Sequence, residues 1–278
     1  MFQKKMPNVL PKPVALSIAG FDPSGCVGVL ADLKTFAAHD CYGVAAVTAI
    51  AAQNTTEIRR LAPVDCPVLK QQIETLLDDV ALAGVKIGLL GSRRNIEVAA
   101  ELLAARPDPP LVLDPVTEEA EPLAKLLLPR ALVFTPGALE AGRLLGIPVD
   151  SLDDMKGAAK LLADRGVPHV VIKGSHLEKP VDVYYDGHDF EVFSGHRHES
   201  QNPYGIGCTF SSAILANLAH GKAVREAIVL AKAYVSQAIA RSYPIGAGRA
   251  PLNHLFRFND GPSRVTGPDP IHEVPQPH

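Results

Sequence analysis

Short apolar runs alternate with longer amphipathic stretches along most of the chain. Apolar runs that end in a glycine or a polar residue predict buried strands over residues 14–19, 42–52, 85–90, 111–114, 132–135 and 169–174. Apolar residues at helical spacing predict helices over residues 29–38, 66–80, 96–105, 153–165 and 224–241, and another that begins at Glu140. This alternation predicts one α/β domain, a mostly parallel central sheet with helices on both faces.

The ends of the chain differ from its middle. Residues 181–185 and 190–193 flank a run of turn residues and predict a small β-hairpin. The alternation of strands and helices runs from residue 14 to 241 without an internal repeat, and we assign the domain to residues 14–256. Residues 1–13 are predicted to be a flexible leader. Residues 257–278, which are rich in proline and poor in apolar side chains, are predicted to be a disordered tail.

The most informative motif is residues 202–212, Asn-Pro-Tyr-Gly-Ile-Gly-Cys-Thr-Phe-Ser-Ser. Gly205 and Gly207 predict a turn that opens directly into a helix, which ends near His220. The first turn of a helix has unpaired N–H groups and a partial positive charge, so a phosphate can bind there. Cys208 lies at this terminus, where the same field favours its thiolate. The pattern is typical of phosphoryl transfer to a hydroxyl. On this stretch alone, the alternative interpretation is equally possible, namely a tightly packed glycine turn with a buried structural cysteine.

Polar residues recur where the predicted strands end. Asp114, Thr135 and Lys173 follow three apolar runs, and Gln53 follows another. Ligands of open α/β sheets bind at the carboxyl ends of the strands, so these residues predict one shared site. Each of them alone is equally compatible with capping or turn chemistry.

The loop after the first strand has glycines at residues 20, 25 and 28, which matches neither the dinucleotide fingerprint nor the P-loop. Asp32 follows this loop, and an exposed acid in the first turn of a helix is its simplest interpretation.

Composition and charge exclude several classes of partner. The chain has 278 residues, a net charge of -3 and no long run of like charges, so neither nucleic acid nor an anionic membrane is expected to bind. No apolar run is long enough to span a membrane, and no signal peptide is apparent. The four cysteines form no CxxC pair, which favours a reducing cytoplasm. His196 and His198 could share a face of a strand, but without a third ligand at a typical spacing we favour a solvated loop over zinc.

The motifs in order resemble hydroxymethylpyrimidine/phosphomethylpyrimidine kinase of thiamin biosynthesis, a member of the ribokinase-like superfamily. The resemblance rests on residues 15–25, 31–36, 47–55, 86–88, 113–116, 173–174, 205–209 and 252–254. It implies a three-layer α/β/α sandwich, a homodimer and transfer of phosphate from ATP with Mg²⁺. The acceptor is expected to be 4-amino-5-hydroxymethyl-2-methylpyrimidine, its monophosphate, or both.

The resemblance also implies roles for single residues. The catalytic set comprises an anion hole and a cysteine base, namely Gly205, Ile206, Gly207 and Cys208. The pyrimidine is expected to contact Gly20, Asp32, Gln53 and Leu89, where an amide and a carboxylate suit an aminopyrimidine. The residues implied to bind ATP are Lys173, Thr209 and Lys232, and those implied near the magnesium are Asp114 and Glu140.

Several positions depart from the family pattern. Ile206 stands where the family has a threonine, Leu89 replaces a methionine, and bulkier residues occupy positions 26–27. Residues 117–122 are acidic where the family has a flap with glycine and lysine, and glutamates there would repel phosphates unless they turn outward. These departures keep two alternatives open. One is a pyridoxal-type vitamin kinase, and the other is a pyrimidine-binding or regulatory relative with weakened phosphoryl transfer.

Overall fold

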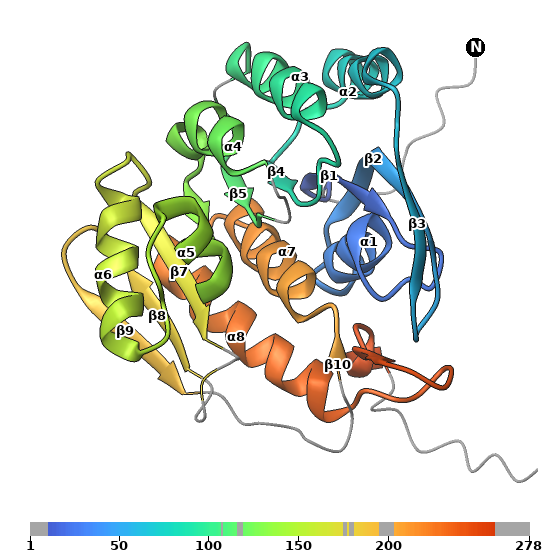
Figure 1. Cartoon of the computed structure of the whole chain (residues 1–278). Coiled ribbons are helices and arrows are strands. Elements are labelled where there is room, and N and C mark those ends of the chain that lie inside the picture. The colour runs from blue at the N-terminus through green and yellow to red at the C-terminus, as the bar shows by residue number, and fades with distance from the viewer. Residues whose placement is uncertain are drawn as a thin grey trace, which may run out of the picture.

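A nine-stranded sheet forms the centre of the computed structural model, which describes residues 11–106, 108–115, 119–174, 177, 181–194 and 203–258. The strand order is β3-β2-β1-β4-β5-β6-β7-β8-β9 (Figure 1). The strands are β1 (Val14–Phe21), β2 (Tyr42–Gln53), β3 (Ile58–Pro63), β4 (Gly84–Ile87), β5 (Leu111–Leu113), β6 (Val133–Phe134), β7 (His169–Gly174), β8 (Val181–Tyr185) and β9 (Phe190–Ser194).

The six central strands, from β2 to β7, pair in parallel, as the alternation of strands and helices predicts. The predicted hairpin, β8 and β9, is antiparallel and extends the sheet beyond β7. At the opposite edge β3 pairs antiparallel with β2, and the sequence did not reveal it. Most of its side chains are exposed and it contains Arg59 and Arg60, so it lacks the apolar pattern that marks a buried strand.

Helices cover both faces of the sheet, and the two faces have separate hydrophobic cores. Because successive side chains of a strand point to opposite faces, Leu111 and Leu113 pack into one core while Val112 packs into the other. The first core joins the sheet to α2 (Cys66–Asp79), α3 (Arg93–Ala104), α4 (Ala120–Leu126), α5 (Ala138–Leu145) and α6 (Leu152–Ala163). The second joins it to α1 (Gly28–Ala38), α7 (Ile206–Ala219) and α8 (Val224–Ala240). The architecture is therefore a three-layer α/β/α sandwich, which confirms the expected fold.

Three smaller elements complete the structure. Short helical turns form η1 (Leu128–Arg130) and η2 (Phe256–Phe258). A separate two-stranded sheet pairs β10 (Pro203–Tyr204) with β11 (Ala250–Pro251), just before α7 begins. It ties the glycine turn at the start of α7 to the C-terminal part of the chain.

Some predictions fall on segments outside the described ranges. They are most of the leader (residues 1–10), the two histidines at 196 and 198, most of the predicted tail (residues 259–278), and residues 116–118 of the acidic stretch. Within the described part of that stretch, Glu121 lies on α4 and pairs with Arg93 of α3 at 3.4 Å. The carboxylate of Glu121 therefore meets a neighbouring helix. None of the helices in the described ranges is both long and apolar enough to span a bilayer.

Candidate active site

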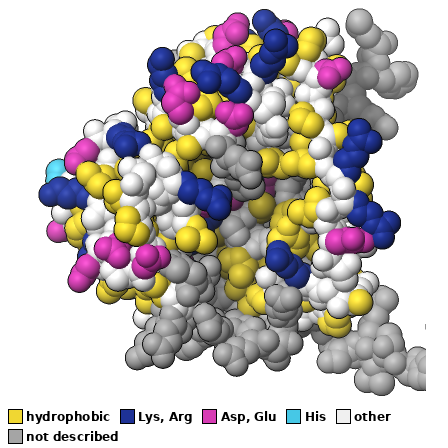
Figure 2. Space-filling model, viewed as in Figure 1, with side chains coloured by type: hydrophobic (Ala, Val, Ile, Leu, Met, Phe, Trp, Pro, Cys, Tyr) yellow, Lys and Arg dark blue, Asp and Glu magenta, His cyan; other side chains and the backbone are white. Residues whose placement is uncertain are grey.

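One cavity, of about 480 Å³, lies where the parallel strands end and α7 begins. In Figure 2 a hollow opens near the middle of this face, with hydrophobic side chains gathered along it. Ten residues that were singled out from the sequence line it: Gly20, Gln53, Leu89, Asp114, Glu140, Lys173, Gly205, Ile206, Gly207 and Cys208. The cavity thus brings together strand ends and a helix start that lie far apart in the sequence, as expected for an open α/β sheet.

The turn that begins α7 is shaped by close backbone contacts. Gly205 is the N-cap and has φ of 93°, in the left-handed region that favours glycine. A Cβ at this position would lie 2.0 Å from the carbonyl oxygen of Cys26. The loop that contains Cys26 is itself held by Asp22, whose carboxylate accepts hydrogen bonds from the backbone N–H groups of Cys26 and Val27 at 3.0 and 3.1 Å. Only glycine fits where these two loops meet.

The first turn of α7 faces a cation and a carboxylate. A Cβ at Gly207 would lie 3.1 Å from Nζ of Lys173 and 3.5 Å from Oδ2 of Asp114. Lys173 Nζ donates to Oδ1 of Asp114 at 2.7 Å. Because the helix N-terminus and the ammonium face the same space, an anion placed there meets two sources of positive potential.

Asp114 and Glu140 differ in their electrostatic surroundings. Burial alone would raise the pKa of Asp114, but Lys173 and Lys86 outweigh it and hold that pKa below its ordinary value. Burial raises the pKa of Glu140, and the nearby Asp114 adds to the effect. The Glu140 carboxylate also accepts a hydrogen bond from the backbone N–H of Gly137 at 2.6 Å. Asp114 is therefore ionised at neutral pH, whereas Glu140 takes up a proton more readily than a free carboxylate.

These two carboxylates fit a magnesium ion that keeps most of its waters. Both line the cavity, and oxygen ligands are what Mg²⁺ prefers. Across the described part of the chain no group of three or more potential ligands gathers for a metal. The donor set suits a cation bound through water and substrate phosphates.

Cys208 lies in the first turn of α7 and lines the cavity, partly exposed. The expectation that its pKa is lowered is wrong. Burial raises the pKa of the Cys208 thiol to about 11, although Lys86 and the N–H of Gly28 act in the opposite direction. Asp32 and Asp114 reinforce the increase, so the thiol is protonated at neutral pH when the cavity is empty.

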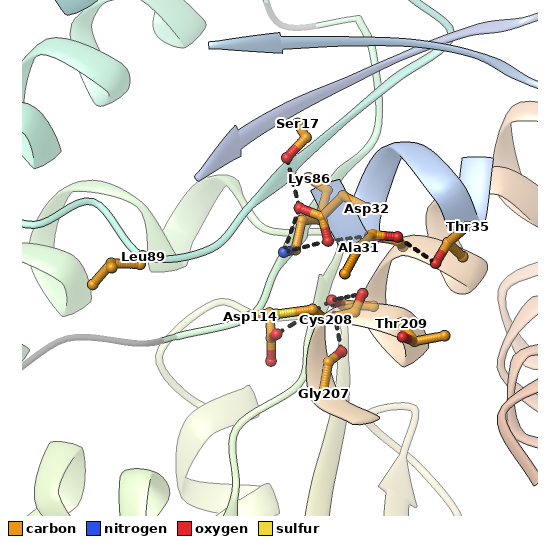
Figure 3. A network of polar contacts seen from close by, with 12 residues as sticks. Ser17, Ala31, Asp32, Thr35, Lys86, Leu89, Asp114, Gly207, Cys208 and Thr209 are labelled. Atoms are coloured by element: carbon orange, nitrogen blue, oxygen red, sulfur yellow. Dashed lines mark hydrogen bonds and ion pairs between the residues drawn. The ribbon is translucent and has the colours of Figure 1, made fainter. Parts of the chain in front are cut away.

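The simpler interpretation of Asp32 as an exposed acid is wrong, because its side chain is buried, while its contact with the pyrimidine stays a prediction. Both Asp32 and Lys86 have side chains that are 0% exposed. Lys86 Nζ lies 3.0 and 2.9 Å from the two Asp32 oxygens, and Ser17 and Ser212 donate to the same carboxylate at 2.6 and 2.8 Å (Figure 3). Every oxygen of Asp32 is thus used by the protein.

Lys86 is the residue at this site that sequence reasoning did not assign a role. Burial alone would lower the pKa of its ammonium, but Asp32 together with Cys208 and Asp114 outweighs burial and raises that pKa, so Lys86 stays charged beneath the cavity, which it lines. A lysine inside an otherwise apolar strand was the available signal, since a buried charge needs a partner. The sequence could not show that Asp32 is that partner.

Two of the predicted ATP contacts lie away from the cavity lining. Thr209 is fully buried, and its hydroxyl lies 3.0 Å from Nε2 of His254, so its expected contact with ATP stays a prediction. The next residue along α7 from Cys208 simply points into the protein. Lys232 of α8 contacts the Asp182 carboxylate of β8, whose Oδ1 accepts from the N–H of Gly174 at 3.3 Å. Lys232 therefore lies near Gly174, the last residue of β7, which directly follows Lys173. Its role in binding ATP stays a prediction.

The other half of the cavity is largely apolar. Leu89 lies over Gly20, where a Cβ would be 3.0 Å from the leucine Cδ2. The Thr48 hydroxyl donates to the carbonyl of Leu89 at 2.5 Å and so holds the loop that presents this leucine. Polar character comes mainly from Gln53, whose Nε2 lies 3.5 Å from the hydroxyl of Tyr204. A flat ring with one polar edge suits this half of the cavity.

Comparison with known proteins gives a consistent picture. The family model described as phosphomethylpyrimidine kinase matches residues 22–253. The hydroxymethylpyrimidine/phosphomethylpyrimidine kinase of Aquifex aeolicus is 38% identical over 248 residues, which cover 84% of this chain and 97% of the relative. The pyridoxine kinase of Bacillus subtilis is 37% identical over 263 residues, covering 88% and 97%. The pyridoxal kinase from Staphylococcus aureus in complex with AMP-PCP and pyridoxal superposes with a TM-score of 0.83 at 37% identity, covering 88% of this chain and 94% of that chain.

Proposed function

This chain belongs to the phosphomethylpyrimidine kinase family, a family of phosphotransferases, and we propose that it transfers the γ-phosphoryl group of ATP to a hydroxymethylpyrimidine or its monophosphate. The observation that carries the proposal is the shared cavity of Cys208, Lys173 and the glycine turn at the start of α7. The complex of the Staphylococcus aureus relative with AMP-PCP supports ATP as the donor.

In the proposed reaction the protein mainly positions charges. Phosphoryl transfer needs little covalent help, so stabilisation of the transferring oxygens dominates. The N–H groups at the start of α7 and the Lys173 ammonium would hold the transferring phosphate. Ile206 contributes a backbone N–H like any residue, while its side chain adds no hydroxyl near the phosphates.

The thiolate form of Cys208 would accept the proton of the attacking hydroxyl. It lies in the same helical turn as the phosphate-binding N–H groups, so a hydroxyl beside its sulfur would face the phosphate. Asp114 and Glu140 would hold Mg²⁺, partly through water, and the ion would neutralise charge on the phosphates. The cytoplasmic location inferred from the cysteines and the homodimer implied by the family resemblance stay predictions, and sedimentation of the purified protein tests the second.

Two vitamin substrates compete for this assignment. The relatives include a pyridoxine kinase and a pyridoxal kinase at 37% identity, within the 35–38% range of the pyrimidine kinases. We favour the pyrimidine because Gln53 offers an amide edge, which matches the adjacent amine and ring nitrogen of an aminopyrimidine. A binding-only relative is the remaining alternative, motivated by Ile206 and the acidic stretch after Asp114.

The decisive experiment is a coupled assay of ADP release with MgATP and each of three acceptors. They are the hydroxymethylpyrimidine, its monophosphate and pyridoxal. Turnover of either pyrimidine with the higher kcat/KM supports the proposal. If the folded protein turns over neither pyrimidine, the proposal is rejected. Calorimetry that shows pyrimidine binding without ATP binding would then favour the binding-only relative.

The activity is expected to increase with pH. Because the pKa of Cys208 is raised to about 11, the thiolate fraction rises about tenfold per pH unit below that value. If the thiolate is the base, kcat should increase steadily between pH 7 and 9, measured by ADP release. The matched control is Cys41→Ser, because burial also raises the pKa of Cys41 to about 11 but that thiol lies outside the cavity. This variant should keep the slope, and a flat profile in the wild type would remove the thiolate from the mechanism.

A further inference from the structure

A ring of contacts surrounds Gln53 and joins three segments that are distant in the sequence. Gln53 ends β2, and its Nε2 lies 3.5 Å from the Tyr204 hydroxyl of β10. The guanidinium of Arg249 lies over the Tyr204 ring, 4.6 Å from its centroid. The backbone N–H of Arg249 in turn donates to the carbonyl of Thr55 at 2.9 Å, two residues beyond Gln53. The contacts therefore return to the segment from which they began.

The backbone holds this ring in place. Tyr204 pairs with Pro251 in the small sheet of β10 and β11, and Gly205 begins α7 immediately afterwards. The N–H of Gly248 donates to Oγ1 of Thr55 at 3.2 Å, and a Cβ at Gly248 would lie 2.1 Å from the Thr55 carbonyl oxygen. The loop before β11 is thus packed tightly against the end of β2. Arg249 holds the face of the Tyr204 ring by a cation–π contact, and Gln53 contacts its hydroxyl.

Both polar groups face the ligand cavity. Tyr204 and Gln53 line it together with the apolar side chains of Leu61 and Leu89. Because Nε2 of Gln53 is turned toward Tyr204, the Gln53 carbonyl oxygen is left to accept a hydrogen bond, and the phenol retains its own O–H to donate. An acceptor and a donor next to each other match an exocyclic amine beside a ring nitrogen. The pyridine ring of pyridoxal has no such amine.

We propose that Tyr204 is a specificity-determining residue that reads the amine and ring-nitrogen edge of an aminopyrimidine together with Gln53, and that Arg249 positions it. This inference rests on the proposed function, since it concerns the acceptor of the same site. A buried site that hydrogen-bonds its substrate rejects analogues that lack the matching groups, because its own polar groups are then left unpaired. Tyr204 therefore favours the pyrimidine over pyridoxal.

The test compares Tyr204→Phe with the wild type, using kcat and KM for the hydroxymethylpyrimidine and for pyridoxal. Tyr204→Phe is expected to raise KM for the pyrimidine about tenfold, with kcat nearly unchanged and with little effect on pyridoxal. Arg249→Met should change KM in the same direction by a smaller factor. In a Gln53→Ala background Tyr204→Phe should have much less effect, because the two groups act together.

The matched control is Tyr184→Phe. Its hydroxyl lies 2.9 Å from Nδ1 of His169 and its side chain does not line the cavity, so the variant loses a hydrogen-bonded phenol without touching the site. It should leave the preference between the two substrates unchanged. If Tyr184→Phe loses its preference for the pyrimidine as much as Tyr204→Phe does, the Tyr204 effect would reflect general destabilisation. That result would overturn the inference.

Calorimetric measurement of how the wild type and Tyr204→Phe bind the hydroxymethylpyrimidine and pyridoxal separates this inference from the proposed function. If the wild type turns over the pyrimidine and Tyr204→Phe keeps its preference, the inference is wrong and the function stands. If the wild type turns over neither compound but binds the pyrimidine, and Tyr204→Phe weakens that binding alone, the function fails and the inference stands. Binding of neither compound by the wild type overturns the inference as well.

Discussion

Replacing Cys208 with alanine is expected to lower kcat with MgATP and the hydroxymethylpyrimidine by a factor of about 100 or more, the effect of losing a general base. The sulfur lines the cavity in the first turn of α7, next to the glycine that faces Lys173 and Asp114. Alanine keeps the helix and its N–H groups, so the phosphate site should survive. The expected signature is a lower kcat with a nearly unchanged KM for ATP, measured by coupled ADP release.

Two further variants sharpen this experiment. Cys66→Ala removes a partly exposed thiol at the start of α2, outside the cavity lining, and should keep wild-type kcat. Cys208→Ser places a hydroxyl where the thiol was. Because a hydroxyl is a much weaker acid than a thiol, it is scarcely deprotonated, and the kcat of this variant should resemble that of the alanine variant. A Cys208→Ala protein that turns over at the wild-type rate would show that the acceptor proton leaves by another route.

Replacing Lys86 with methionine is expected to destabilise the protein by about 3–5 kcal/mol, because it leaves the Asp32 carboxylate buried without its cation. Both side chains are 0% exposed, and the ammonium contacts both carboxylate oxygens. The loss is measured as the free energy of unfolding in urea. Asp32→Asn combined with Lys86→Met removes both charges, so the double variant should regain most of that stability.

An exposed ion pair provides the comparison for this result. Lys222, just before α8, and Glu226 of α8 lie 2.8 Å apart with side chains about half exposed. Lys222→Met should leave stability nearly unchanged because water screens such pairs. If Lys86→Met proves as stable as this control, the Asp32 carboxylate must be satisfied by protonation or by the two serines. The pair would then contribute charge to the cavity without supporting the fold.

Local pattern accounts for most of the fold. Six apolar runs predicted the six parallel strands, and polar residues at their ends predicted the edge at which the cavity lies. The edge strand β3 was not predicted, because Ile58–Pro63 is held in place by pairing with β2 and lacks an apolar pattern of its own. The short helix α4, which begins in the acidic stretch, was not predicted either, since its sequence includes a proline and its apolar face is brief.

The sequence by itself determined the class of fold and the location of the glycine turn that begins α7. Both depend on spacing within a few residues, such as the two glycines before Cys208. Only the tertiary structure decided which charged groups reach the ligand. The Asp32 carboxylate contacts Ser212, 180 positions away, and Lys86, 54 positions away, so its partners come from distant parts of the sequence. The same enclosure reverses the expected acidity of Cys208. Burial and distant charge partners set these properties, and neither is encoded in any local run of residues.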